Sequence, residues 1–227
     1  MCWNASISLN TFIFSVATLG FIAYNNAYTK YKLPEFTAGP WLYAFILSVS
    51  GMQLVEYFLW SGKSPTTGGA TFGNANTNNT MSIVGSLLLI TQPFFLSLAA
   101  GLPKLTMAYA AFAFLFILAK YPNNLARFST VKTGEGLEWR WYDDYEYQWI
   151  YYLAYWATAV ACAFYVPVYL SVAIFGVAAI TLARWWNGKT LMWASKYCWG
   201  LNVLAFYYLY RIMIAMPFKE MLGTCKN

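Results

Sequence analysis

The chain has 227 residues, of which 60% are hydrophobic, 21% aromatic and only 10% charged. A soluble domain carries about 25% charged residues, so this chain has too few to cover its apolar side chains in water. Its net charge of +6 comes from scattered Lys and Arg residues, without the basic run or stripe that nucleic-acid binding requires. Composition therefore predicts an integral membrane protein whose main partner is the lipid bilayer, and it excludes nucleic acid.

Histidine is absent from the chain, which removes His-based zinc, haem and copper sites as well as serine–histidine triads. The four cysteines show neither a CxxC pair nor the spacing of a disulfide framework. Three acidic residues cluster in one loop, at Asp143, Asp144 and Glu146, where a solvated acidic run is the ordinary interpretation. We therefore expect no metal site and no catalytic residues, and we do not predict an enzyme.

Seven apolar stretches are long enough, or nearly so, to cross a hydrocarbon layer of about 30 Å as helices. They are Ile7–Ala27, Pro40–Trp60, Met81–Ala100, Leu105–Ala119, Trp149–Tyr165, Val168–Ala183 and Leu191–Ala215. Pro167 separates the fifth from the sixth, and Pro217 is expected to close the seventh. Trp and Tyr residues gather at the margins of these stretches, as they do at headgroup level. The pattern predicts one all-α domain over residues 1–227, a bundle of seven transmembrane helices.

Two connections have distinctive sequences. The segment Lys63–Thr80 is rich in Gly, Thr and Asn and is predicted to be a flexible polar loop. The longest connection, 120–148, holds five of the eight acidic residues. Within it, strand-like sequences flank TGEG at 133–136, which predicts an extramembrane β-hairpin over the mouth of the bundle.

Seven crossings place the two termini on opposite sides of the membrane. We call the N-terminal side A and the opposite side B. Nothing basic precedes the first stretch, whereas Lys30 and Lys32 follow it, which favours an extracellular or lumenal side A and a cytosolic C-terminus. The N-x-S/T sequons at Asn4 and Asn78 both fall on side A and agree with this orientation.

Glu56 is the one acidic residue in any of the seven stretches, and it lies near the side A end of the second. A carboxylate at bilayer depth is costly, so it is expected to face the protein interior and to have a partner. Gln53 is three residues earlier and shares its helical face. Lys196, in the seventh stretch, is the cation at a similar depth, and the two charges can meet if their helices are neighbours. The alternative is that Lys196 extends to the interface while Glu56 is protonated or bonded to amides.

Two further amides complete the predicted polar set. Gln92 lies mid-way along the third stretch, next to Pro93, and Asn202 lies six residues beyond Lys196. Amides inside a membrane bundle either contact a ligand or hydrogen-bond between helices, and both interpretations remain open. We take Glu56, Lys196, Gln53, Gln92 and Asn202 as the candidate ligand- or ion-binding residues.

The sequences MCWNASISLNTFIF, MQLVEYFLW and TQPFF resemble an uncharacterised seven-transmembrane family of giant viruses, algae and fungi whose members open with Met-Cys-Trp. The resemblance covers most of the chain, and its most specific parts are Met1-Cys2-Trp3, Gln53/Glu56 and Gln92-Pro93. It implies a seven-helix fold and no particular activity.

A weaker similarity is to microbial rhodopsins. In KYCWGL, Lys196 stands ahead of Gly200-Leu201 as the retinal lysine of that family does, and Thr91-x-Pro93 is similar to their third helix. This resemblance implies retinal as a cofactor, with Lys196 as the Schiff base and Glu56 as its counterion. The chain departs from the family at Met192, where an aspartate is expected, and in lacking a third-helix carboxylate.

Three functions follow from these features. The first is a ligand-binding or ion- or proton-translocating bundle with an intramembrane polar site around Glu56. The second is a retinal photoreceptor that uses Lys196. The third is a structural membrane component of a virion or a larger complex, in which the polar set serves only helix packing and the chain acts as a homo-oligomer or accessory subunit.

Overall fold

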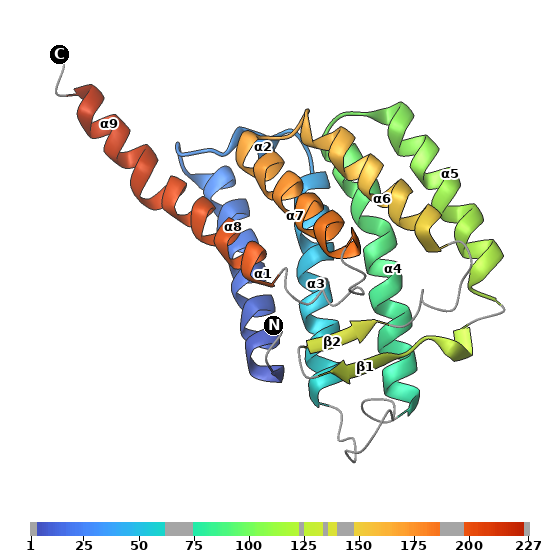
Figure 1. Cartoon of the computed structure of the whole chain (residues 1–227). Helices are drawn as coiled ribbons and strands as arrows, with labels where there is room; N and C mark the ends of the chain where they lie inside the picture. The colour runs from blue at the N-terminus through green and yellow to red at the C-terminus, as the bar shows by residue number, and fades with distance from the viewer. Residues whose placement is uncertain are drawn as a thin grey trace.

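The computed structural model describes residues 4–61, 75–122, 125–133, 136–139, 148–186 and 198–224. Long helices dominate it, and a small two-stranded sheet lies at one end (Figure 1). The elements are α1 (Ala5–Tyr28), α2 (Pro34–Thr37), α3 (Trp41–Ser61), α4 (Ala75–Ala99), α5 (Pro103–Lys120), η1 (Leu125–Arg127), β1 (Thr130–Thr133), β2 (Gly136–Trp139), α6 (Gln148–Ala163), α7 (Val168–Trp186), α8 (Cys198–Tyr210), a π-helical segment (Arg211–Ala215) and α9 (Met216–Thr224).

Among the described residues, four helical stretches are long and apolar enough to cross a membrane: Ala5–Tyr28, Trp41–Ser61, Thr77–Ala99 and Gly200–Gly223. Helix α1 shows why lipid is their solvent. Its buried face carries Ser8, Thr11 and Ser15, whereas Ile13 and Tyr24 are exposed. A helix in water shows the reverse arrangement, because burial of apolar surface stabilises it there. The chain is therefore a membrane protein.

Three apolar helices are shorter: Pro103–Ala119, Ile150–Ala163 and Val168–Leu182. They coincide with the fourth, fifth and sixth predicted stretches. Their outer surfaces are also apolar, with Phe114 and Leu115 exposed on α5 and Val172 and Leu182 exposed on α7.

Helix α3 packs between α1 and α4, and the antiparallel α3–α4 pair passes through the middle of the molecule (Figure 1). The two helices approach closely at Gly51, where a Cβ atom would lie 3.1 Å from the Leu88 Cδ1 atom. Small residues allow this close approach in membrane bundles, where dispersion contacts between helices are a main source of stability.

A tight corner joins α4 to α5. Gly101 has φ = +69°, a conformation that L-residues with a Cβ adopt at a cost. The Leu102 N–H donates to the Ser97 carbonyl (3.0 Å) and the Gly101 N–H to the Leu98 carbonyl (3.1 Å), which closes the end of α4 as a Schellman motif. Pro103 then occupies the first turn of α5, where its missing N–H has no partner to lose.

The prediction that Pro217 closes the seventh helix is wrong. Helical structure continues through this proline to Thr224. The π-helical turn Arg211–Ala215 precedes it, and the Met216 N–H bonds the Arg211 carbonyl five residues back. This wider turn resets the hydrogen-bond ladder just before the residue that lacks an N–H, so the helix tolerates Pro217.

The predicted polar loop 63–80 extends too far. Residues 62–74 lie outside the described ranges, but helix α4 begins at Ala75 and includes the remaining part of the segment. Asn78 is buried there, and its amide forms two hydrogen bonds with the backbone of Thr130, donating to the carbonyl (2.8 Å) and accepting from the N–H (2.9 Å). These tertiary bonds outweigh the low helix propensity of the Asn/Thr-rich sequence.

The same contacts remove the Asn78 sequon as support for the orientation. A side chain that is 1% exposed and bonded on both amide atoms cannot carry a glycan in this fold. At the other sequon, Asn4 is exposed and caps α1 by accepting from the Ile7 N–H at 2.9 Å.

Strands β1 and β2 pair antiparallel, with Thr130 opposite Trp139 and Thr133 opposite Gly136. They lie within the 120–148 connection, in the place where the sequence predicts a hairpin. Asn78 and Asn79 of α4 bind the segment that leads into β1, since Asn79 donates to the carbonyls of Leu125 (2.6 Å) and Phe128 (2.9 Å). The sheet is thereby attached to the side A end of α4 (Figure 1).

We expect Asn78→Ala to lower the free energy of unfolding by about 2 kcal/mol, because it leaves a buried backbone N–H and C=O of Thr130 without partners. Asn10→Ala, at an exposed position of α1, is the matched control. Detergent-denaturant unfolding measures both variants, and hydrogen exchange at the Thr130 amide should accelerate only in the first. Equal stability of the two variants would show that α4 does not hold the strand.

Candidate functional site

Glu56 and Gln53 are both buried on α3, with exposed fractions of 0% and 2%. They are one turn apart and therefore lie on the same side of the helix. Burial on the central helix keeps the carboxyl group away from the acyl chains, which is the arrangement expected of a carboxylate at membrane depth. Met52, Val55 and Leu59, which are close to this polar pair along α3, belong to one of the two apolar clusters of the interior.

Gln92 lies on the neighbouring helix but at a different height. Gly51 lies opposite Leu88 in the antiparallel pair. At 1.5 Å per residue, Gln92 is therefore about 9 Å closer to side B than Gln53. Its Oε1 atom accepts a hydrogen bond of 2.7 Å from the Tyr155 hydroxyl of α6. The structure therefore joins Gln92 to α6 rather than placing it beside the carboxylate.

Asn202 joins a third pair of helices. Its Nδ2 atom donates to the Thr11 Oγ1 atom of α1 at 3.2 Å, so it holds α8 against α1. Its Oδ1 atom is buried and accepts no hydrogen bond from a described residue. This geometry agrees with the interpretation of Asn202 as a link between helices.

Lys196 falls outside the described residues. Its pairing with Glu56 and its role as a Schiff-base lysine therefore remain predictions. The retinal site that the rhodopsin resemblance implies remains a prediction with it.

Helix α4 carries a line of buried polar side chains that we call the α4 polar column: Asn78, Ser82, Ser86, Gln92 and Ser97, each at most 5% exposed. The column extends over about 28 Å, which is close to the thickness of the hydrocarbon layer. Hydroxyl groups on neighbouring elements bond to it, including Thr130 with Ser82 (2.7 Å), Tyr121 with Ser86 (2.7 Å) and Thr106 with Ser97 (2.8 Å). By the α3–α4 register, Glu56 lies at about the height of residues 82–86.

A second polar site lies at the side B end, on a loop that the sequence analysis did not single out. The chain between α1 and α3 is held by two asparagines at the end of α1. The Asn25 Nδ2 atom donates to the Tyr31 carbonyl (2.6 Å), and Asn26 Oδ1 accepts from the Leu33 N–H (2.8 Å). Pro34 then starts the short helix α2, and Glu35 follows it.

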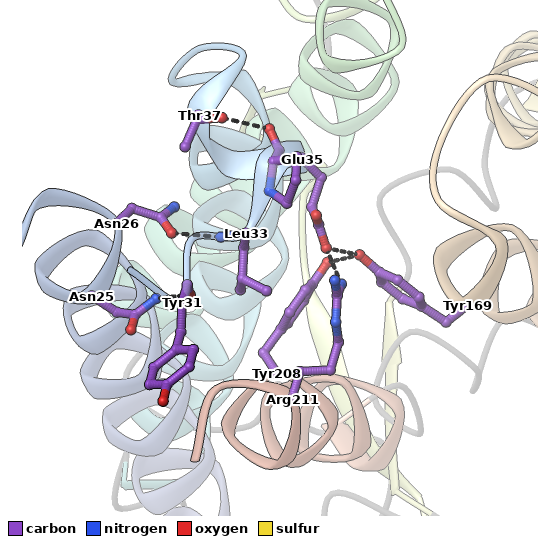
Figure 2. Close-up of polar contacts among 10 residues, drawn as sticks. Asn25, Asn26, Tyr31, Leu33, Glu35, Thr37, Tyr169, Tyr208 and Arg211 are labelled. Carbon is purple, nitrogen blue, oxygen red and sulfur yellow. Dashed lines mark hydrogen bonds and ion pairs between the residues drawn. The ribbon is translucent and has the colours of Figure 1, made fainter. Parts of the chain in front are cut away.

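Glu35 is the centre of this second site, which we call the Glu35 cluster (Figure 2). Its Oε1 atom forms an ion pair with Arg211 of the π-helical segment and accepts a hydrogen bond from the Tyr169 hydroxyl of α7. The Tyr208 hydroxyl of α8 donates to that of Tyr169 at 2.9 Å. The Glu35 and Arg211 side chains are only 11% and 23% exposed. Because its members come from four elements, the cluster fixes α2, α7, α8 and the π-helical segment together.

Aromatic contacts complete the Glu35 cluster. The Arg211 guanidinium lies 5.8 Å from the ring centroids of both Tyr169 and Tyr207, within the range of cation–π attraction. Phe36 packs edge-on against Tyr208 with centroids 4.9 Å apart. The sequence signal was available, since an arginine interrupts the apolar run YYLYRIMIAM. Its partner was not predictable, because Glu35 lies in the connection between α1 and α3, 176 residues away.

Comparisons with protein families, curated proteins and solved structures find no match to this chain. The resemblances to the Met-Cys-Trp family and to microbial rhodopsins therefore stay predictions. Within the described ranges, no group of three Cys, Asp and Glu side chains is placed to hold a metal ion.

We expect Arg211→Met to destabilise the protein by about 2 kcal/mol, because it leaves the largely buried Glu35 without its cation. The double variant Glu35→Gln/Arg211→Met should lose less than the sum of its two single variants, with a coupling of about 1 kcal/mol or more. The exposed pair Lys30–Glu220, at 65% and 41% side-chain exposure, is the matched control and should show little coupling. Additive effects at Glu35 and Arg211 in a detergent-unfolding cycle would contradict the proposed ion pair.

Proposed function

We propose that this membrane protein crosses the bilayer seven times and conducts protons or small cations through its interior, with Glu56 as the intramembrane binding site. The observation that supports the proposal is the complete burial of the Glu56 side chain on the central helix α3. A carboxyl group is costly to retain at bilayer depth, and such groups commonly belong to ion pathways or proton relays.

The α4 polar column supports the same proposal. A proton relay requires a series of polar groups, and the column supplies hydroxyl and amide groups over about 28 Å, with its widest interval, about 9 Å, between Ser86 and Gln92. Ser82 and Ser86 lie near the height of Glu56, while Gln92 and Ser97 continue the column toward side B. In this proposal Glu56 takes a proton or cation from side A and the column passes it onward.

The structural alternative uses the same residues differently. If the chain is only a packing component of a virion membrane or larger complex, the buried hydroxyl and amide groups serve as bonds between helices. Ion flux separates the two functions, because packing alone does not require the charge of Glu56.

We expect proteoliposomes with the full chain to dissipate an imposed pH gradient faster than protein-free liposomes, measured with an entrapped pH-sensitive dye. Glu56→Gln should reduce the flux to the protein-free level, because the amide has nearly the same shape but cannot exchange a proton. Lys104→Gln, an exposed charge-to-amide change at the start of α5, is the matched control and should leave the flux unchanged.

Thermal unfolding in detergent shows whether Glu56→Gln folds. If a folded Glu56→Gln variant conducts like the original chain, Glu56 is not the ion site. Absence of flux in the unmodified chain with either protons or Na⁺ would favour the structural alternative.

The seven crossings can be tested with single cysteines in a background without the four native ones. Seven crossings with side A outside should make Asn4→Cys and Arg127→Cys accessible to a membrane-impermeant maleimide on intact cells. Lys104→Cys and Lys219→Cys should react only after permeabilisation. If only α1, α3, α4 and α8 cross the membrane, residue 127 would lie inside and residue 219 outside. If all four cysteines show the opposite accessibility, the predicted orientation is wrong.

A further inference from the structure

An open groove of about 410 Å³ lies at the side B end, between the loop after α1 and helix α9. Its lining residues are Lys30, Tyr31, Lys32, Met216, Lys219 and Glu220. Three of the six are lysines. The structure describes five cationic side chains, of which Lys30, Lys32 and Lys219 line this groove.

Glu220 neutralises only part of this charge. It forms an ion pair with Lys30 and accepts from the Tyr31 hydroxyl at 2.8 Å. The hydrogen bond to Glu220 raises the pKa of Lys30, which keeps this lysine charged. Lys32 and Lys219 form no ion pair with any described residue, so two positive charges in the groove are available to an anion.

The surroundings of the groove are apolar. Met216 lies in the lining and packs against the hydrophobic core. On α9, Leu222 is more than half exposed and lies one turn beyond Lys219, whereas the exposed Phe218 and Met221 lie on the side of the helix opposite the groove. Tyr24 and Tyr28 are exposed on the last turns of α1, which is typical of residues at headgroup level. A ligand of this groove therefore meets cations at one end and an apolar surface next to them.

We propose that the groove binds the phosphate group of an anionic phospholipid, with Lys32 and Lys219 contacting the phosphate and the apolar side chains of Met216 and Leu222 contacting the acyl chains. Basic pockets beside transmembrane helices recognise lipid headgroups in this way, through charge rather than through a covalent step. A free phosphate would use the lysines but would gain nothing from Met216 and Leu222 or from a position at headgroup level, which is the reason for choosing the lipid. The proposal depends on the membrane location of the chain and not on ion conduction through Glu56.

The test is native mass spectrometry of the purified full chain in a neutral detergent, titrated with phosphatidylglycerol or phosphatidylcholine of identical acyl chains. We expect phosphatidylglycerol to bind more tightly than phosphatidylcholine. Lys32→Gln/Lys219→Gln should weaken phosphatidylglycerol binding about tenfold or more, since each basic residue near a lipid surface contributes about 1 kcal/mol.

Two variants serve as controls. Lys104→Gln removes an exposed lysine elsewhere and should bind phosphatidylglycerol like the original chain. Lys32→Arg/Lys219→Arg retains the charge and should preserve binding, which separates loss of charge from loss of fold.

Three results would overturn the proposal. The first is equal binding of the two lipids, and the second is equal weakening by Lys104→Gln. The third is displacement of phosphatidylglycerol by inorganic phosphate at equal concentration, which would assign the groove to a free anion. None of these results depends on ion flux, so the lipid site and the conducting role of Glu56 fail separately.

Discussion

The solvent around the helices dictates how this chain distributes its polar groups. In α1, Ser8, Thr11 and Ser15 are buried and Ile13 and Tyr24 point outward, because the exterior is hydrocarbon and offers no hydrogen bonds. The same rule accounts for Glu56 and Gln53, which occupy the interior side of α3, and for the α4 polar column. The hydrogen bonds among these groups then determine which helices are neighbours.

Two groups of polar contacts lie at opposite ends of the molecule, one near side A and one at side B. Near side A, the amides of Asn78 and Asn79 attach β1 and the segment before it to the start of α4, and Glu56 lies about 7 Å deeper in the bundle. At side B, the Glu35 cluster connects α2, α7 and α8. Bonds of this kind are directional, so they select one arrangement among helices whose apolar surfaces would pack in many ways.

Helix positions were predictable from the sequence because hydrophobic length is a local property. Six of the predicted stretches coincide with helices, and the described part of the seventh does so from Cys198 onward. The burial of Glu56 followed from the cost of a charge in lipid, which needs no knowledge of the fold. The start of α4 and the passage of α9 through Pro217 were not predictable, since they depend on Thr130 and on the π-helical turn. For the same reason, Gln92 and Asn202 were assigned to a common site although their bonds lead to Tyr155 and Thr11. The Glu35 cluster was not predictable from the sequence, because its ion pair joins distant parts of the chain.

The π-helical segment also sets the rotational phase of the C-terminal helix. Each residue turns an α-helix by about 100°, so the extra residue of a π turn rotates everything beyond it by that amount relative to α8. With this offset, Glu220 faces Lys30 while Arg211, at the start of the same segment, faces Glu35. Deletion of one residue between Arg211 and Ala215 would shorten the apolar sequence by only that residue, yet Lys219 and Glu220 would point to a different part of the membrane surface.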